Sequence, residues 1–276
     1  MNKKQSLLQK FVAAPYTVWS VLFIIIPLVM VLYYSLTDSN GAFTIENIVK
    51  LAEREYISIF SRSIVFAFVA TVVCLIIAFP LAYFISQTKP RTQKTAIMLT
   101  MLPMWTNLII RTYSLGNLIE DTGVINTLLN FDSPIHMINT PFAVILGMVY
   151  NYLPFMVLPI YTVISKLDKN VIEASQDLGC NRLQVIAKII LPLSKSGIVS
   201  GITMVFVPAI STFYISQKLG GKDCRLIGEE IEAAFMQSGN RNFGSAISLI
   251  LMILIMLSIA VMNKFSDDEE GGGMIL

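Results

Sequence analysis

The side chains that most often carry out covalent or metal chemistry are few and scattered in this chain. Its three cysteines, Cys74, Cys180 and Cys224, form no Cys-x-x-Cys pair, and His136 is the single histidine. A histidine-based metal site or a Ser-His-Asp triad needs more partners than this. No glycine-rich phosphate loop ending in Gly-Lys-Ser/Thr is present to bind ATP. The sequence therefore predicts neither catalysis nor a cofactor, and any energy must come from another protein.

The composition is that of a membrane protein. Of the 276 residues, 55% are hydrophobic and 14% charged, and the mean hydropathy is +0.69. Soluble domains carry about 25% charged residues. The net charge of +2 is too small to indicate a nucleic-acid partner. We expect an all-α, polytopic protein whose partners include the lipid bilayer.

Six apolar segments are long enough to cross a bilayer as helices, which needs about 20 residues. The first is longer than a signal-peptide core and lacks a clear cleavage site, so we expect it to be retained. Prolines inside several segments are compatible with spanning, because neighbouring helices can satisfy the freed carbonyls. The expected spans are residues 16–36, 64–86, 96–118, 141–165, 197–216 and 244–262.

Lys and Arg are unevenly distributed between the segments that join these spans. With the amino terminus inside, the inner segments hold twelve of them and the outer segments hold seven. Because segments rich in Lys and Arg stay in the cytoplasm, we expect both termini there. The predicted organisation is a cytoplasmic segment 1–15, a six-helix domain 16–265 with a cytoplasmic loop 166–196, and a disordered acidic, glycine-rich tail 266–276.

Arg111 is the single formal charge expected inside the six spans. Such a charge is rare and usually faces an aqueous cavity or the interior of the helix bundle. With Asn107 and Ser114 it would give the third span a polar stripe. Two interpretations remain open: the stripe lines a solute path, or Arg111 reaches the helix end or braces neighbouring carbonyls.

Aromatic side chains in the spans offer a second kind of chemistry. Their faces can bind ammonium groups, with about 0.5 to 2 kcal/mol from each contact. Packing or anchoring at the membrane interface is the alternative role for such residues. Five aromatic residues, two residues of the polar stripe and Asn151 are the eight candidate residues of a substrate path: Trp105, Asn107, Arg111, Tyr113, Tyr150, Asn151, Phe213 and Tyr214.

The loop 166–196 carries the clearest helix signals in the polar regions. Asn170, with Glu173 three residues later, predicts a capped helix start, and Gly179 supplies the left-handed residue that would end that helix. Asn181 then predicts a second start, with Gln184 three residues on. We expect this loop to form a helix, a tight turn and a second helix.

The same loop resembles the "EAA" loop of the membrane subunits of bacterial ABC importers. In that family the loop is a coupling helix that sits in a groove of the ATP-hydrolysing subunit. Ser175 departs from the family pattern, where alanine is usual, but it keeps a small side chain at that position. An ordinary helix-turn-helix between spans is the alternative. The resemblance implies eight ATPase-coupling residues: Glu173, Ala174, Ser175, Leu178, Gly179, Ile189, Leu191 and Pro192.

A finer resemblance, to the permeases of spermidine/putrescine importers, extends from about residue 60 to residue 262. Asn242 departs from it, because a tryptophan often stands there. The segments that carry it are PMWTNLIIRTYSL at 103–115, GMVYNYLPFMVLPIY at 147–161 and QKLGGKDCRLIGEEI at 217–231. A polyamine would be repelled by Arg111, so this resemblance implies that Arg111 is shielded from the path.

The resemblance implies a transport subunit of the bacterial cytoplasmic (inner) membrane rather than an enzyme. Its partners would be a second, similar permease, two ATP-binding subunits and an extracytoplasmic solute-binding protein that supplies selectivity. One alternative is an ABC permease for another cationic or amino-acid-derived solute. Another is an ion-coupled secondary transporter, against which the lack of Asp and Glu in the expected spans argues.

Overall fold

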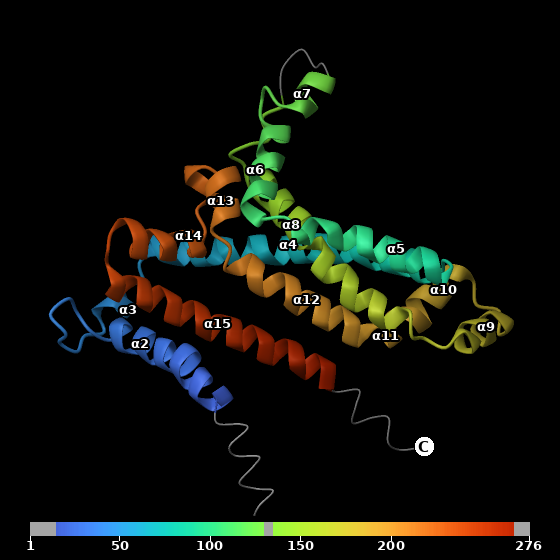
Figure 1. Ribbon diagram of the computed structural model, residues 1–276, viewed down its shortest axis with the longest axis horizontal. Coiled ribbons are helices and arrows are strands. Elements are labelled where there is room, and N and C mark those ends of the chain that lie inside the picture. The colour runs from blue at the N-terminus through green and yellow to red at the C-terminus, as the bar shows by residue number, and fades with distance from the viewer. Residues whose placement is uncertain (1–14, 130–134, 268–276) are drawn as a thin grey trace, which may run out of the picture. The chain divides into compact units, whose positions relative to one another are not determined.

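The computed structural model describes residues 15–129 and 135–267 (Figure 1). These residues are almost entirely helical, and one antiparallel bridge between Thr37 and Phe43 is the β pairing among them. The predicted segment 1–15 and tail 266–276 lie almost wholly outside the described residues. Contacts divide the chain into two compact units: residues 1–57 and 230–253 form unit 1, and residues 58–229 and 254–276 form unit 2.

The described part of unit 1 begins with a helical stretch, Pro15–Ser35. In the most apolar 18-residue window of this stretch, no residue is buried. It contains a π-helical turn η1 (Val21–Ile25) and α2 (Ile26–Ser35), and α3 (Glu46–Lys50) follows. Asn242, at the start of α15 (Arg241–Asp267), donates from Nδ2 to the carbonyls of Tyr34 at 3.2 Å and Thr37 at 2.7 Å. The residue that departs from the family pattern thus caps the end of the first helix.

Unit 2 holds most of the remaining helices, and α4 and α15 pass through both units. In order they are α4 (Arg54–Ser86), α5 (Pro90–Met101), η2 (Leu102–Trp105), α6 (Leu108–Ile119), α7 (Val124–Leu129), α8 (Pro141–Ile164), α9 (Lys169–Asp177), α10 (Arg182–Val185), η3 (Ile186–Ile190), α11 (Leu191–Leu193), α12 (Lys195–Ile210), α13 (Tyr214–Leu219) and η4 (Lys222–Cys224). The chain enters unit 1 again within α14 (Ile227–Glu232), which η5 (Ala233–Gln237) follows.

Four uninterrupted helices in the described residues are long and apolar enough to cross a membrane: Pro15–Ser35, Arg54–Ser86, Pro141–Ile164 and Arg241–Lys264. A fifth apolar stretch is bent, because Arg182–Leu193 meets Lys195–Ile210 at 69°. The expected span 96–118 is not one helix but is divided between α5 and α6. The structure therefore confirms an all-α membrane fold with several apolar helices, while the count of six spans stays a prediction.

The break between α5 and α6 has a local cause. Pro103 lies in a 3₁₀ turn, and Thr106 then adopts an extended backbone with φ −88° and ψ 151°. Asn107 caps the next helix, because its side-chain oxygen accepts from the Ile109 N–H at 2.7 Å. Asn is a preferred N-cap residue, so it favours a new helix start over continuation of the old one. The prediction that Asn107 lies inside a continuous span is therefore wrong.

α8 and α12 pack closely in unit 2 (Figure 1). Gly197 and Gly201 are one turn apart on α12, and both face α8. A Cβ at Gly197 would lie 2.8 Å from the Pro159 carbonyl oxygen, and one at Gly201 would lie 2.7 Å from Met156 Sδ. Small residues four apart allow such close approach of membrane helices.

Residues 211–229, the returning segment, fold back after α12 and pack against α6 and α8 through α13. The Ile227 N–H donates to Ser63 Oγ at 2.8 Å, and both residues are buried. A Cβ on Gly228 would lie 2.4 Å from the Ser211 carbonyl oxygen. A region expected from the sequence to be largely an outer loop is thus part of the core of unit 2.

Candidate functional site

The first helix of the loop 166–196 starts earlier than predicted. Asp168 is the N-cap of α9, and its carboxylate accepts from the Asn170 N–H at 2.9 Å. Asp is as good a cap as Asn, and it stands where the chain is still extended. The predicted capping box of Asn170 and Glu173 is therefore wrong. Glu173 becomes the fifth residue of α9 and lies outside its first turn.

The end of α9 is as predicted. Gly179 has φ +87°, in the left-handed region. Its N–H donates to the Gln176 carbonyl at 2.8 Å, and the Cys180 N–H donates to the Ser175 carbonyl at 3.1 Å. This pair of bonds is the Schellman motif. A Cβ on Gly179 would meet nothing within 4 Å, so the requirement for glycine comes from the backbone alone.

The second helix start is also confirmed. Gln184 N–H donates to Asn181 Oδ1 at 2.8 Å, and the Asn181 N–H donates to Gln184 Oε1 at 2.8 Å. The helix then widens into the π-helical η3 and continues through Ile189, Leu191 and Pro192 to the 69° bend. Pro192 has no N–H to donate, which accounts for a local departure from α-helical bonding here.

The loop has one buried side and one exposed side. Ser175 is buried, and its hydroxyl donates to the Ile172 carbonyl at 2.7 Å, so the extra polar atom has its own partner. Glu173 and Ala174 are exposed. Leu178 is 87% exposed and Leu183 is 76% exposed, which is unusual for leucine.

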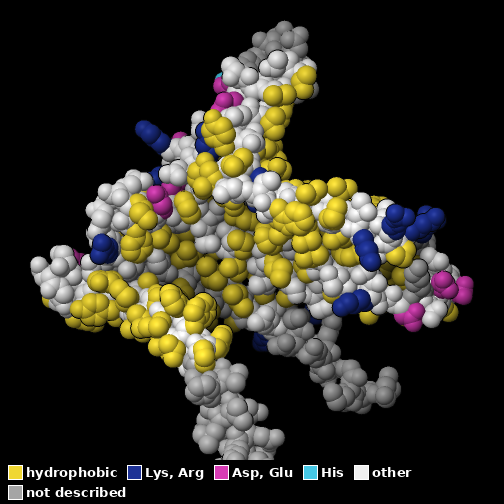
Figure 2. All heavy atoms as spheres, viewed as in Figure 1, with side chains coloured by type: hydrophobic (Ala, Val, Ile, Leu, Met, Phe, Trp, Pro, Cys, Tyr) yellow, Lys and Arg dark blue, Asp and Glu magenta, His cyan; other side chains and the backbone are white. Residues whose placement is uncertain are grey.

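Figure 2 shows Lys, Arg, Asp and Glu side chains gathered at the end of unit 2 that α9 and α10 form. Exposed apolar side chains rimmed by charges are typical of a protein interaction site. We name residues 168–193 the coupling surface, after the role that the resemblance of this loop implies. Leu183 was not among the predicted coupling residues; an apolar residue two positions after the Asn181 cap was the signal for it.

Most of the predicted path residues on η2 and α6 reach the surface of this chain. Trp105 is 74% exposed, Tyr113 is 50% exposed, and Asn107 is exposed. Arg111 is buried, and its Nε and Nη1 atoms have no hydrogen-bond partner in the described residues. Both interpretations of Arg111, as a residue that lines a path and as a brace for neighbouring helices, stay predictions.

Two contacts join α6 to its neighbours. Lys218 Nζ lies 4.7 Å from the ring centroid of Tyr113. Asn151 is fully buried on α8, and its Nδ2 donates to Thr112 Oγ1 at 3.2 Å and to the Gly147 carbonyl at 2.8 Å. Asn151 thus holds α6 against α8, and the ammonium group of Lys218 lies over the face of the Tyr113 ring.

The other predicted path residues lie on α8 and at the start of α13. Tyr150 on α8 is 43% exposed and Phe213 is 45% exposed. Tyr214 is half-buried and begins α13. The predicted aromatic residues thus belong to η2, α6, α8 and the start of α13, and their place along a path stays a prediction.

A half-buried acid, Glu229, was missed because the sequence placed it in an outer loop. Glu229 Oε2 accepts from Ser216 Oγ at 3.2 Å, and its Oε1 lies 3.8 Å from Arg225 Nε. Cys224, nearby in sequence, is buried, and burial raises the pKa of its thiol. Polar residues among apolar ones at 211–229 were the available signal for a folded insertion.

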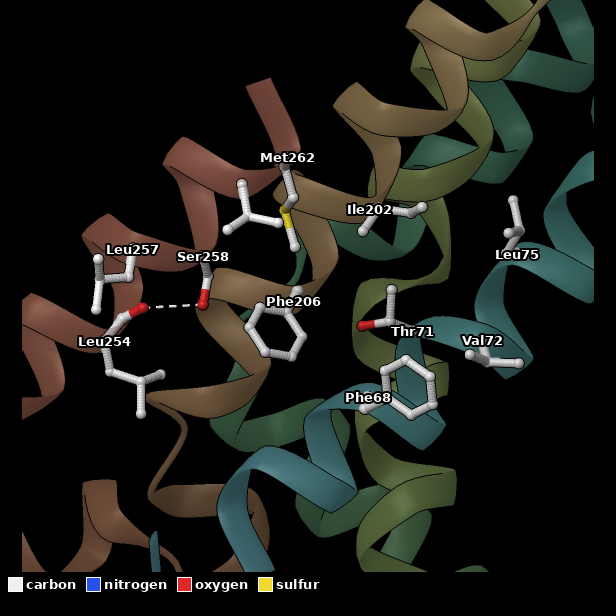
Figure 3. Close-up of a pocket in the computed structure, with 11 residues that line it drawn as sticks. Phe68, Thr71, Val72, Leu75, Ile202, Phe206, Leu254, Leu257, Ser258 and Met262 are labelled. Atoms are coloured by element: carbon white, nitrogen blue, oxygen red, sulfur yellow. Dashed lines mark hydrogen bonds between the residues drawn. The ribbon is translucent and has the colours of Figure 1, made fainter. Parts of the chain in front are cut away.

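An apolar groove of about 420 Å³ lies between α4, α12 and the second half of α15 (Figure 3). Its two hydroxyls are already bonded to their own helices, Thr71 to the Ala67 carbonyl at 2.7 Å and Ser258 to the Leu254 carbonyl at 2.8 Å. No charged side chain lines it. The lining of the groove suits apolar groups.

Residues 5–268 match the family described as "Binding-protein-dependent transport system inner membrane component". The chain is 38% identical over 263 residues to the spermidine/putrescine transport system permease protein PotB of Haemophilus influenzae, covering 92% of each chain. It is 36% identical over 253 residues to the protein of the same name from Escherichia coli, covering 88% of this chain and 92% of the relative.

Solved structures show the same fold at low sequence identity. A chain of the bacterial alginate ABC transporter, in complex with an alginate pentasaccharide-bound periplasmic protein, superposes with a TM-score of 0.76 at 16% identity and 95% coverage of both chains. A chain of the MetNI methionine ABC transporter superposes with a TM-score of 0.60 at 16% identity, covering 75% of this chain and 93% of that one. The chain belongs to the family of binding-protein-dependent transport system inner membrane components and is a membrane-spanning permease subunit of an ABC importer.

Proposed function

We propose that this permease carries polyamines such as spermidine and putrescine. The observation that carries the proposal is the name shared by the two relatives at 36–38% identity, each matched over about nine-tenths of its length. The contact between Lys218 Nζ and Tyr113 supports it, because it shows an ammonium group on an aromatic face beside α6. Weak contacts of this kind suit the passage of a solute better than its retention.

We further propose that the coupling surface docks onto an ATP-binding subunit. Leu178 and Leu183 are the exposed apolar anchors, and the Gly179 turn fixes the angle between the two helices that carry them. α9 follows α8 directly in unit 2, so displacement of α9 would be transmitted to α8 and to α12, which packs on it. ATP-driven closure of the ATPases would then alternate the access of the path.

The assembly proposed around this chain has a second, different permease, two ATP-binding subunits and an extracytoplasmic solute-binding protein. ATP would bind to the partner subunits, since this sequence has no phosphate loop. The proposed orientation places both termini and the loop 166–196 in the cytoplasm. The proposed organisation keeps residues 16–265 as the membrane domain.

Arg111 favours one alternative solute class. Its buried Nε and Nη1 atoms lack partners in the described residues, and a carboxylate is the usual partner of a guanidinium. An amino-acid-derived solute carries a carboxylate, whereas a polyamine carries none. Import of radiolabelled putrescine by the reconstituted importer, competed with spermidine or with amino acids, separates the two proposals; competition by amino acids and not by spermidine would overturn the polyamine proposal.

The coupling proposal is tested by Gly179→Val and Glu173→Lys. Gly179→Val places a β-branched side chain at φ +87°, at a cost of about 1 to 2 kcal/mol or more in the turn. Glu173→Lys reverses an exposed charge on α9. We expect ATP-driven import and copurification of the ATPase to fall at least about tenfold in both variants, which corresponds to about 1.4 kcal/mol.

Gly41→Val is the matched control for the backbone strain that Gly179→Val introduces. Gly41 has φ +80°, and a Cβ there would meet no atom closer than 3.9 Å, but it lies in the loop before α3. It should lower stability slightly and leave the ATPase bound. Normal import by both coupling variants would overturn the coupling proposal.

The orientation is tested with a new cysteine. The native Cys224 is 2% exposed, so a maleimide would not reach it. Lys222, two residues earlier, is exposed. In the proposed orientation, a membrane-impermeant maleimide should label Lys222→Cys on cells stripped of their wall, and Cys180 should react only after permeabilisation. Labelling of Cys180 before permeabilisation, with Lys222→Cys protected, would reverse the orientation.

A further inference from the structure

A polar cavity lies in unit 1, and none of the residues that the sequence assigned to the path lines it. Its volume is about 400 Å³, and it is formed where α3 ends, α4 begins and the chain passes from α14 through η5 into α15. The side chains that matter for its chemistry are Lys50, Tyr56, Glu230, Gln237 and Phe243. All belong to unit 1.

The cavity already holds a primary ammonium group. Lys50 Nζ lies 4.9 Å from the ring centroid of Phe243. The Tyr56 ring meets the Phe243 ring edge-on, with centroids 5.1 Å apart and planes at 68°. Phe243 is buried and packs against Tyr56, which restricts the movement of the ring that carries the ammonium, and its backbone N–H donates to Asn240 Oδ1 at 3.1 Å.

The charges of the cavity favour a cation as its ligand. Lys50 and Glu230 are its charged lining residues and have opposite signs. Lys50 is exposed, and its ammonium group is attached to a long flexible stem. The ammonium group can therefore leave the cavity without a change in the backbone. Its departure would leave one carboxylate and two aromatic rings, which together attract an ammonium group. An anion would instead meet that carboxylate and the negative face of Phe243.

We propose that this cavity binds primary alkylammonium groups, and that Lys50 occupies it when no ligand is present. The inference rests on the proposed function for the choice of a polyamine as the solute. The cavity lies at the amino-terminal ends of α4 and α15, which face outward in the proposed orientation. There it would receive one end of a diamine before the solute enters the membrane domain.

The test measures putrescine binding to the complete importer in lipid nanodiscs by equilibrium dialysis, without the solute-binding protein. Lys50→Met removes the resident ammonium and keeps much of the stem, and it should tighten binding about threefold to tenfold. Glu230→Gln and Phe243→Leu should each weaken binding about threefold to tenfold. Arg54→Met removes a positive charge from exposed residue 54, outside the cavity lining, and should leave binding unchanged.

Import of putrescine is measured in parallel, so that the two proposals fail separately. Unchanged or weaker binding by Lys50→Met, in an importer that still carries putrescine, overturns the cavity site and leaves the proposed function standing. The expected binding pattern in an importer that carries no polyamine supports the cavity site and overturns the polyamine proposal. Because Lys50 is exposed, its variant does not depend on the packing that Phe243→Leu disturbs.

Discussion

The coupling surface and the returning segment are both short helices joined by glycine turns, yet they are built in different ways. The coupling surface takes its shape from its own neighbours in sequence: the caps Asp168 and Asn181 and the left-handed Gly179. The returning segment takes its shape from distant residues. Ile227 bonds to Ser63, and the Gly220–Gly221 turn lies beside Asn139, whose N–H donates to the Leu219 carbonyl.

This difference between local and long-range contacts indicates which parts of the permease can move independently. A segment that local hydrogen bonds hold can dock onto a partner and shift as a unit, because few of its contacts are broken by the shift. A segment that long-range contacts hold can shift only together with the helices around it. The first property suits a coupling element, and the second suits the support of a path.

The largest expected effect on stability is that of a substitution at Gly228, in the returning segment. A Cβ there would lie 2.4 Å from the Ser211 carbonyl oxygen and 2.5 Å from that of Thr212, which are backbone atoms that cannot turn aside. Gly228→Ala should lower the free energy of unfolding in detergent by about 3 kcal/mol. Thermal unfolding of the purified chain measures this.

Gly116→Ala is the control for Gly228→Ala. A Cβ at Gly116 would lie 3.3 Å from Leu219 Cδ2, the end of a flexible side chain, so its effect should be about 1 kcal/mol or less. Equal melting temperatures for the two variants would show that the returning segment is not held by the backbone contact at Gly228.

The next effect compares two arginines beside the returning segment. Arg62 Nη1 donates to the carbonyls of Asp223 and Arg225, whereas Arg111 Nε and Nη1 are buried without a partner in the described residues. Arg111→Met should therefore leave the isolated chain as stable or more stable, by up to about 3 kcal/mol, because an uncompensated buried charge is removed.

Arg62→Met should act in the opposite direction and lower stability, because two carbonyls lose a donor. Both variants are compared by thermal unfolding of the isolated chain and by import in the complete transporter. A loss of stability on Arg111→Met would show that this guanidinium braces the bundle. A loss of import without a loss of stability would assign it to the path or to a partner subunit.

The smallest effect concerns the coupling surface itself. Asn181→Ala removes one half of the capping box and should cost α10 about 1 kcal/mol. Because the cap acts locally, we expect little change in the melting temperature of the whole chain and about a fivefold loss of ATPase affinity, read from copurification at graded concentrations. A large fall in melting temperature would contradict the local construction of this surface.

The sequence by itself determined the all-helical membrane class, the helix-turn-helix at 166–196 and the left-handed residue at Gly179. These follow from hydropathy and from caps that act over three or four residues, so no distant contact is needed to predict them. The cap at Asp168 was missed because two acceptable caps stand two residues apart, and pattern alone does not choose between them.

Only the tertiary structure decided the rest. It divided residues 96–118 between two helices, buried Arg111, left Glu229 half-buried, and brought Lys50 onto Phe243 from a position 193 residues away in sequence. Each of these depends on which helices pack together, and hydropathy reports how apolar a segment is without reporting its neighbours. A polar residue in a segment between spans is compatible with water or with a buried partner, and only the packing around it selects one of them.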